Sequence, residues 1–507
     1  MSTIKRAFYG PIVHSKSVTE IEYLTAALLG VNEDGTIAFV DKHVEGQDVI
    51  RALADRGWGA IEPYKMNKGE FLMPGMIDTH THAPQYVNLA YGQQFELLDW
   101  LKHVTFPTEK RFSDPEYAAR TYEAVVQRLI DCGTTTVCYY GTLHMTTTIL
   151  AAVCKRKGQR AFVGKCNMDR ESAPDYQEES AEQSLEDTRV FIDFVRRRLG
   201  ERGANCSQTA LVQPIVTPRF AIACSDELLS GLGRMLSDDP SLPCQTHLSE
   251  NPSEIAFTKS LFPGVENYAA VYDKFGLLRR NTILAHCVHL EEAEIGLIAE
   301  KQCGVSHCPN SNFNLRSGAT KVGTLLDRGI KVGLGTDVSG GCSIGILSAI
   351  RSASTASKTL AFQARDGPAT ENRVNGTGTR FASQHLSVDT LFYLATMGGA
   401  ELTCLDDRIG NFMPSKEFDA LLVQTGQKPD VAQRATSSAS VLDVAERALK
   451  VETDSQFATA HFGNGVLVEP EDDLVKIVEK FLFGGDDRNI GTVFVRGRVI
   501  GGARPIH

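Results

Sequence analysis

Short apolar runs alternate with amphipathic segments through the middle of the chain, between about Phe71 and Asp337. Each run is rich in apolar or β-branched residues and ends in polar residues or glycine. The runs are LMPGMIDTHTH, GTTTVCYYGT, AFVGKCNMD, ALVQPIVTPRF, LPCQTHLSE, NTILAHC, CGVSHCPNSN and IKVGLGTDV. Between them lie segments such as DPEYAARTYEAVVQRLIDCG, in which apolar residues recur every three or four positions. The pattern predicts eight strand–helix units in succession.

Strands that alternate with helices are expected to lie parallel, and eight such units over roughly 265 residues match a (β/α)8 TIM-like barrel. In that fold the functional residues come from the C-terminal ends of the strands. A doubly wound open sheet is the structural alternative. However, no GxGxxG motif follows an early strand and no GxxxxGK[ST] motif occurs. The sequence therefore favours the barrel, an α/β fold.

The two ends of the chain carry a different pattern, with short strand-like runs broken by Asp-Gly or Gly. Examples are TAALLGVNEDGTIAFVDKH, FDALLVQTG and TVFVRGRVI. Neither end has enough strands for a stable sheet, so we predict that both join in one small β-sandwich domain. The predicted boundaries are 1–72 and 406–507 for this β-domain and 73–405 for the barrel. Two polar, glycine-rich stretches, 365–380 and 452–465, predict surface loops.

Composition narrows the class of protein. The 507 residues are 42% hydrophobic and carry a net charge of -10, so a large core is expected and attraction to nucleic acid or anionic lipid is not. No leader-like or membrane-spanning apolar run occurs, which predicts a soluble cytoplasmic protein. The 12 cysteines form no CxxC pair and lie mostly in apolar segments, as free buried thiols would. Zinc-finger and disulfide-scaffold proteins are excluded.

His80 and His82 are the first candidate metal ligands. They lie two residues apart on a predicted strand, so their side chains share a face, and at a barrel strand end that face is the pocket. Imidazole suits zinc, and a catalytic zinc typically takes three protein ligands and keeps one position open. His247, His286 and Asp337 each end another predicted strand and are available as further ligands. The sequence therefore predicts a metal site at the mouth of the barrel.

With these residues in place, the chain resembles the metal-dependent amidohydrolase superfamily and, within it, the guanine deaminases. The resemblance rests on FLMPGMIDTHTHAPQY, DWLKHVTFPTEKRF, GTTTVCYYGTLH, QRAFVGKCNMD, PIVTPRF, HLSEN, SHCPNSN, GLGTDVSGG and GDDRNI, in order along nearly the whole chain. The chain departs from the pattern after Ala364, between about Gln424 and Phe462, and in MPSKEFDALLV. These departures lie outside the predicted pocket.

The resemblance implies zinc-dependent hydrolytic deamination of guanine to xanthine and ammonia, in purine catabolism or salvage. Zinc-bound hydroxide would attack C2, Glu250 would shuttle the proton, Asp337 would act as the base and His286 would lie beside the metal site. It also implies one zinc per chain and a homodimer, with no nucleic-acid or membrane partner. The implied metal ligands are His80, His82, His247 and Asp337. The implied substrate-binding residues are His82, Ala83, Pro84, Gln85, Arg219, Phe220, His247, Glu250 and Asp337.

Related chemistries are separated by particular residues. Binuclear amidohydrolases need a lysine at the fourth strand end, where this chain has IVTPR from Ile215 to Arg219. Zinc deaminases of the other fold carry HxE and PCxxC, and the sequence after Pro243 lacks the second cysteine. Two alternatives stay open: a mononuclear amidohydrolase that deaminates another ring, such as cytosine or an aminotriazine, and a noncatalytic amidohydrolase-like assembly protein. The second is expected to have lost ligands that are present here.

Overall fold

The computed structural model describes residues 5–173, 175–200, 210–366, 381–382, 385–425 and 466–506. The surface loops expected at 365–380 and 452–465 lie outside these residues, apart from the end of a helix at Asp366. Among the described residues, no helix combines the length and apolar character needed to cross a membrane. The described cysteines are all free, and nine of them are buried, whereas Cys342 is exposed and Cys404 is half-buried.

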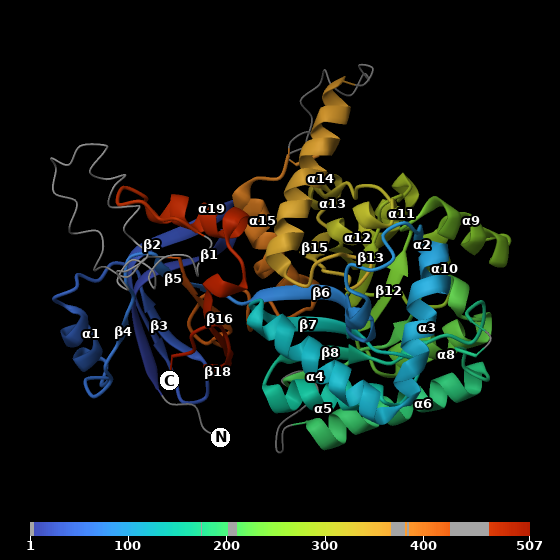
Figure 1. The fold of residues 1–507 in the computed structure, drawn as a ribbon, viewed down its shortest axis with the longest axis horizontal. Helices are drawn as coiled ribbons and strands as arrows, with labels where there is room; N and C mark the ends of the chain where they lie inside the picture. Colours follow the sequence, from blue (N-terminus) through green and yellow to red (C-terminus); the bar gives the residue numbers. More distant parts are fainter. Residues whose placement is uncertain are drawn as a thin grey trace, which may run out of the picture.

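Each of the eight predicted runs contains a strand, and the strands form two four-stranded parallel sheets (Figure 1). One sheet has the order β10-β8-β7-β6 and the other the order β12-β13-β14-β15. The strands are β6 Met76–His82, β7 Thr134–Tyr140, β8 Arg160–Gly164, β10 Val212–Pro214, β12 Cys244–Leu248, β13 Thr282–His286, β14 Gly304–His307 and β15 Lys331–Leu334. A short parallel pair, β9 Cys166–Asn167 and β11 Thr217–Pro218, extends the first sheet's strand ends. The predicted α/β fold with parallel strands is confirmed.

Backbone hydrogen bonds join the two parallel sheets at both edges. At one edge the Asp337 amide donates to the His80 carbonyl (2.9 Å) and the His82 amide donates to the Val338 carbonyl (3.2 Å). At the other edge the Val216 amide donates to the Pro243 carbonyl (2.9 Å). As a result, the C-terminal ends of β6, β12, β13 and the segment after β15 face one another.

Helices follow the strands in the predicted alternation. Asp114 caps the helix expected after the first strand by accepting the amides of Glu116 and Tyr117, and that helix, α4, spans Pro115–Asp131. The others around the parallel sheets are α2 Leu97–Trp100, α3 Phe106–Glu109, α5 Thr147–Lys157, α6 Ala181–Phe194, α8 Asp226–Asp238, α9 Pro252–Leu261, α10 Tyr268–Lys274, α11 Glu292–Glu300, α12 Pro309–Asn314, α13 Val322–Asp327, α14 Ile346–Asp366, α15 Val388–Ala395 and α16 Met397–Leu402. Short 3-10 or π turns lie at η1 Ala83–Asn88, η2 Leu101–Thr105, η3 Lys110–Ser113, η4 Val195–Leu199 and η5 Ala221–Ala223.

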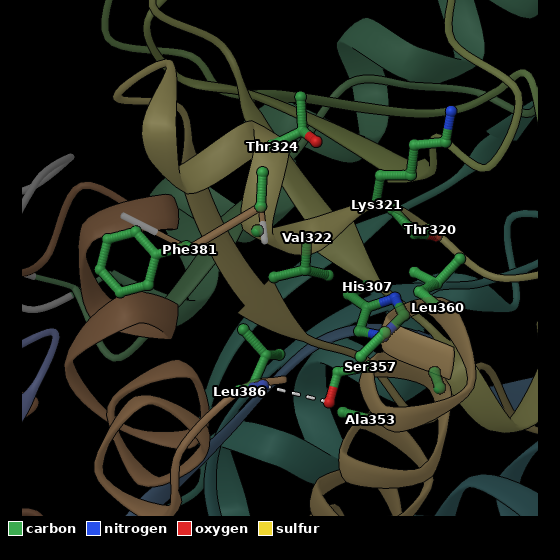
Figure 2. A pocket seen from close by; sticks show the side chains of 14 residues that line it. His307, Thr320, Lys321, Val322, Thr324, Ala353, Ser357, Leu360, Phe381 and Leu386 are labelled. Carbon is green, nitrogen blue, oxygen red and sulfur yellow. Dashed lines mark hydrogen bonds between the residues drawn. The ribbon is translucent and has the colours of Figure 1, made fainter. Parts of the chain in front are cut away.

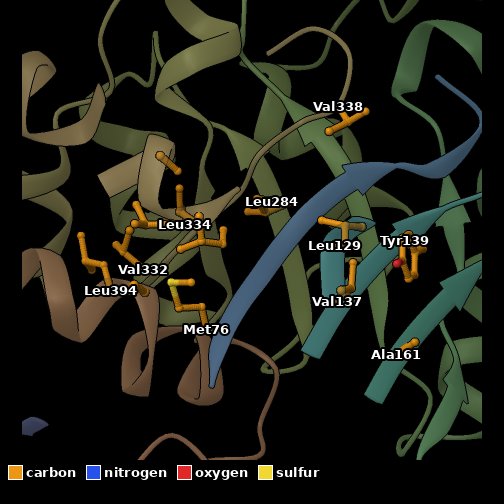
Figure 3. Packing of buried hydrophobic residues seen from close by; sticks show 14 of the residues in the cluster. Met76, Leu129, Val137, Tyr139, Ala161, Leu284, Val332, Leu334, Val338 and Leu394 are labelled. Carbon is orange, nitrogen blue, oxygen red and sulfur yellow. The ribbon is translucent and has the colours of Figure 1, made fainter. Parts of the chain in front are cut away.

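The apolar side chains of the strands pack against these helices. Figure 3 shows Val137 of β7, Leu284 of β13 and Val332 of β15 in one cluster with Leu129 of α4 and Leu394 of α15. All five are at most 1% exposed. Removal of this apolar surface from water is the main force that holds helices and strands together.

Strands from both ends of the chain form one further sheet, on the left in Figure 1. Its order is β18-β17-β16-β5-β1-β2-β3, with β4 paired to β1. The strands are β1 Arg6–Ser17, β2 Glu20–Val31, β3 Ile37–Asp41, β4 Tyr64–Lys65, β5 Glu70–Pro74, β16 Ala420–Gln424, β17 Ile490–Val495 and β18 Arg498–Gly501, with α1 Val49–Asp55, α19 Leu474–Gly484 and η9 Asp487–Asn489 beside them. The predicted hairpins are the antiparallel pairs β2–β3 and β17–β18. The second layer of a sandwich and the exact domain boundaries stay predictions.

A buried ion-pair network connects this sheet to the parallel strands. Arg160, the first residue of β8, is 1% exposed and donates from Nε to Asp419 Oδ2 at 2.9 Å. It also donates to Glu417 at 2.5 Å, and Arg408 and Arg496 contact the same Glu417. Burial alone would raise the pKa of Glu417, but the three arginines lower it to about 2. The carboxylate is therefore ionised in the folded protein at neutral pH.

Candidate active site

The predicted pair of histidines at the end of β6 points to one place. His80 Nε2 lies 3.1 Å and His82 Nε2 lies 3.5 Å from the same oxygen, Oδ1 of Asp337. The three side chains are buried, at most 5% exposed as whole residues. Two residues apart on a strand, the histidines share a face, as the sequence predicts.

His247 and His286, at the ends of β12 and β13, complete the group. His82 Nε2 and His247 Nε2 are 3.1 Å apart. His247 Nδ1 donates to the Arg219 carbonyl at 2.6 Å, and because a carbonyl only accepts, the proton of the neutral ring belongs on Nδ1. Nε2 therefore turns a lone pair toward His82. Hydrogen bonds of this kind on the outer nitrogen fix the tautomer of metal-binding histidines.

His286 is oriented in the same way by a short hydrogen-bonded circuit. Asn312 donates from Nδ2 to Thr320 Oγ1 (3.1 Å), and Thr320 donates to the His286 carbonyl (2.8 Å). With its NH2 group so engaged, Asn312 offers Oδ1 to His286 Nδ1 at 2.9 Å. The lone pair of His286 Nε2 thus faces the centre of the group.

The donor set fits a metal ion. Ligand atoms of His80, His247, His286 and Asp337 all lie within 4.8 Å of one another, and His82 lies against this group through His247. Nε2 of His80 and Nε2 of His286 are buried, and among the described residues neither makes a well-directed hydrogen bond, although both lie within 3.7 Å of Asp337. Three or four imidazole nitrogens with one carboxylate oxygen are a ligand set that suits zinc.

The charge states of His82, His247 and Asp337 agree with this interpretation, whereas burial would lower the pKa of His286 but Glu250 and Asp337 raise it. Burial holds the pKa values of His82 and His247 well below the ordinary value, so both rings are neutral. Burial would raise the pKa of Asp337, but the histidines around it, His80 first, hold that pKa well below its usual range. Neutral imidazoles around an ionised carboxylate are the protonation states in which these side chains bind metals.

The backbone at the strand ends is bent so that the ligands point inward. His286 and Asp337 have φ of 70° and 46°, in the left-handed region that non-glycine residues seldom adopt. Glycine in GLGTDVSGG makes room beside Asp337, because a Cβ on Gly340 would lie 2.8 Å from Asp337 Oδ2. Both features place the carboxylate against His80.

A pocket opens beside the ligand group, with a volume of about 390 Å³ including its mouth. Its residues are His82, Gln85, Leu97, Trp100, Leu101, Arg219, Phe220, His247, Glu250, Glu254, Leu315 and Asp337. The structure therefore brings the predicted substrate residues Gln85, Arg219, Phe220 and Glu250 to one pocket. Ala83 and Pro84 do not line it: they are buried in the first turn of η1, and their substrate contact stays a prediction.

Glu250 has the environment of a proton carrier. Its side chain is 2% exposed at the residue level, accepts from Ser317 Oγ at 3.1 Å and lies 3.4 Å from His286 Nε2. Burial raises the pKa of Glu250 to about 7. Glu254, in the first turn of α9, accepts the Glu250 and Asn251 amides and so fixes where the residue lies. A carboxyl with a pKa near 7 can both give and take a proton at neutral pH.

Other residues of the site are not evident from the sequence. Trp100, Leu97 and Leu101 form an apolar wall of the pocket, and Glu109 lies behind Gln85 and Arg219 without lining it. Glu109 lies in VTFPTEKRF, a segment that carries the family resemblance but to which the resemblance assigns no role, and there a carboxylate stands among aromatic and apolar residues. A buried charged side chain needs a partner, but the pattern does not say which.

His307 lies apart from the ligand group. It faces a second pocket, of about 630 Å³ including its mouth, between α13 and α14 (Figure 2). Leu360 and Leu386 line the same pocket, and Ser357 accepts the Leu386 amide at 3.2 Å. Burial lowers the pKa of His307 to about 3, so its ring is neutral.

Comparisons with known proteins agree with the geometry. Residues 71–500 match the amidohydrolase family. The chain is 40% identical to the guanine deaminase of Dictyostelium discoideum over 503 residues, 98% of each chain. It is 35% identical to the Homo sapiens guanine deaminase over 502 residues, 99% of this chain and 97% of that one. A crystal structure of guanine deaminase from C. acetobutylicum with bound guanine in the active site superposes with a TM-score of 0.77 at 32% identity, covering 98% of this chain and all of that one.

Proposed function

The chain belongs to the amidohydrolase family, and we propose that it hydrolyses guanine to xanthine and ammonia. The observation that carries the proposal is one pocket in which a metal-ligand group, the proton carrier Glu250 and the hydrogen-bonding residues Arg219 and Gln85 meet. The likeness to guanine deaminases over nearly the full chain, and to a guanine-bound structure, supports guanine as the substrate.

His80, His82, His247 and Asp337 would hold one zinc ion per chain, with His286 beside them. The two nitrogens without well-directed hydrogen bonds and the neutral state of the His82 and His247 rings support this assignment. When bound, zinc lowers the pKa of a water molecule from 15.7 to about 7, which makes hydroxide available at neutral pH.

The protein groups then move the protons. Asp337 takes the proton that the attacking water loses, and Glu250 gives a proton to ring N3 as the new C2–O bond forms. Asp337 then returns its proton to the amino nitrogen, the C2–N bond breaks and ammonia leaves. Glu250 takes back a proton as the C2 hydroxyl becomes a carbonyl, so both carboxyl groups return to their starting states. The ring retains the oxygen, so guanine plus water gives xanthine plus ammonia. His286, 3.4 Å from Glu250 and 3.7 Å from Asp337, lies between the two carboxyl groups and supports the transfer.

Arg219 and Gln85 are proposed to recognise the base, with Phe220 against its face. Guanine presents a carbonyl at C6, and a guanidinium has only donors, so the two are complementary. An amino group at C6 would face Arg219 donor to donor. The pocket is thereby expected to prefer 6-oxo over 6-amino purines.

Two finer points of architecture belong to the proposal. We infer that the two parallel sheets close into an eight-stranded (β/α)8 barrel, which the hydrogen bonds at both sheet edges support. We also propose a homodimer, which light scattering on the purified protein would test.

The deciding experiment is an ultraviolet assay of purified, zinc-loaded protein against guanine, adenine, cytosine and ammeline, with ammonia measured. Conversion of guanine to xanthine with equal release of ammonia is expected, at a kcat/KM well above that for the other rings. If cytosine or ammeline were turned over with a higher kcat/KM than guanine, that ring and not guanine would be the substrate. Absence of turnover by protein that holds zinc would favour a noncatalytic role.

A further inference from the structure

One buried carboxylate contacts both residues proposed to read the edge of the base. Glu109, the last residue of α3, is fully buried. Its Oε1 accepts from Gln85 Nε2 at 2.9 Å, and its Oε2 accepts from Arg219 at 2.6 Å and from the Tyr176 hydroxyl at 2.8 Å. Glu109 and Tyr176 do not line the pocket, so any effect on the substrate passes through Gln85 and Arg219.

Glu109 fixes which end of the Gln85 amide faces which neighbour. A carboxylate only accepts, so the NH2 group must face Glu109, and the Ser339 amide donates to Oε1 on the other side at 3.2 Å. Rotation of the Gln85 amide by 180° would place its Oε1 against the Glu109 carboxylate and its NH2 group against the Ser339 N–H, and neither contact could be a hydrogen bond. One N–H and one lone pair of Gln85 are left, in defined directions, for a bound ring.

Two residues of α3 hold the Arg219 guanidinium, one at its edge and one at its planar face. Glu109 accepts from one terminal nitrogen, and the guanidinium carbon lies 5.5 Å from the ring centroid of Phe106, the first residue of α3. Burial would lower the pKa of Arg219, and Glu109 raises it above its ordinary value. The pair also cancels the charge of a buried guanidinium, which suits a neutral ligand.

We propose that Glu109 is the positioning residue that sets guanine specificity, by fixing the donor and acceptor directions of Gln85 and Arg219. The inference rests on the proposed function, because it assigns the discrimination between 6-oxo and 6-amino purines to this carboxylate. Tyr176 supplies the third donor to Glu109 and limits its rotation.

The test compares kcat/KM for guanine with kcat/KM for 2,6-diaminopurine, which has the same 2-amino group but an amino group at C6. Glu109→Gln keeps the size of the side chain and places an NH2 group against Gln85 or Arg219. The ratio is expected to fall about 10 to 150-fold, the worth of a hydrogen bond to a charged group. Tyr176→Phe, which keeps the carboxylate, should lower the ratio by a smaller factor, about 2 to 10-fold. Arg219→Ala should lower it about as much as Glu109→Gln.

A double variant separates positioning from general damage. If Glu109 acts through Arg219, adding Glu109→Gln to Arg219→Ala should lower the ratio little further, whereas independent effects would multiply. The matched control is Glu417→Gln, another carboxylate paired with arginine, whose side chain is 15% exposed and does not line the pocket. It is expected to lower the melting temperature and leave the ratio unchanged.

An unchanged ratio in Glu109→Gln protein with normal zinc content would overturn the proposal. So would full multiplication both with Arg219→Ala and in a second double variant with Gln85→Ala, because Glu109 would then act through neither residue. If Glu109→Gln does not fold, the Tyr176→Phe variant provides the test. A wild-type ratio of kcat/KM for guanine to kcat/KM for 2,6-diaminopurine in that variant would contradict a positioning role for Glu109. Failure of the proposed function is seen separately, in the wild-type enzyme, as absence of xanthine from guanine. In that case both assignments fall.

Discussion

A histidine binds a metal through the nitrogen that carries no proton, and in this site the hydrogen bond on the other nitrogen decides which one that is. The Arg219 carbonyl holds the proton of His247 on Nδ1, and Asn312 does the same for His286. Both partners lie outside the ligand group, and the sequence assigns this task to neither of them. At this scale the chemistry depends on the neighbours of the ligands as much as on the ligands themselves.

His82→Ala is predicted to remove zinc and activity. His82 Nε2 lies within 3.5 Å of both His247 and Asp337, so its loss opens one side of the ligand group. Metal analysis of protein purified without chelator should find about one zinc per chain in the wild type. His307→Gln, a change at another buried histidine, should keep the zinc. Two tightly held ions in the wild type, or an active His82→Ala enzyme with zinc, would contradict the mononuclear assignment.

Glu250→Gln is predicted to keep the metal and slow turnover. The amide can still accept from Ser317 but cannot carry a proton, so kcat should fall by about two to four powers of ten, the usual worth of a positioned acid or base. Single-turnover kinetics with guanine, together with zinc content, provide the measurement. Wild-type turnover would reduce Glu250 to a structural residue.

At the scale of helices and strands, the backbone leaves regular strand geometry at the C-terminal ends of the parallel strands, where individual φ angles decide which way a side chain points. Ser249, His286 and Asp337 all adopt positive φ just where their strands end. Such strained positions cost about 1 to 3 kcal/mol each and persist where the surrounding structure holds them. Here they turn the side chains of His286 and Asp337 toward the same ligand group.

Gly340→Ala is predicted to damage the metal site without unfolding the protein. A Cβ there would lie 2.5 Å from Ser311 Oγ and 2.8 Å from Asp337 Oδ2, so Asp337 must shift. Zinc affinity, measured by competition with a chelator, should drop, and activity should fall with it. The control is Gly296→Ala in α11, where a Cβ meets nothing within 4 Å and a more stable helix is expected. Unchanged zinc affinity in Gly340→Ala would show that the loop can adapt.

At the scale of the whole molecule, strands from both ends of the chain form one sheet that is joined to the parallel strands by charge as well as by apolar packing. Phe8 stacks on Phe418 at 5.3 Å, which brings the two ends of the chain together. Arg160 reaches from β8 into this sheet through Glu417 and Asp419. Removing one member of a buried ion pair leaves an uncompensated charge, which makes this connection sensitive to change.

The same network predicts how stability depends on pH. The pKa of Glu417 is about 2 in the folded protein and 4.5 ordinarily, so its contribution is complete above about pH 4.5 and is lost as the pH falls toward 2. Glu417→Gln should lower stability at neutral pH and flatten the loss between pH 4.5 and 2. Urea unfolding at a series of pH values provides the comparison. Parallel wild-type and variant curves over that range would exclude this role for Glu417.

The order of apolar and polar positions along the chain was enough to predict eight alternating strands and helices, and with them the convergence of His80, His82, His247, His286 and Asp337. That much follows because polar residues at the C-terminal ends of parallel strands must meet at one edge. The sequence also indicated Gln85, Arg219, Phe220 and Glu250 through the family resemblance. These predictions depend on local periodicity and on position within a strand, which a linear pattern records.

The residues that lie behind this group and hold it in place could be identified only from the folded chain. Glu109 and Arg219 are 110 positions apart, and Gln85 and Ser339 are 254 apart, so no local pattern connects them. The structure also groups His286 with His80, His247 and Asp337, while His82 contacts this group through His247 and Asp337, a distinction that spacing along the chain does not reveal. Contacts between distant segments depend on how helices and strands pack, and packing is set by the sum of many weak apolar contacts along the whole chain.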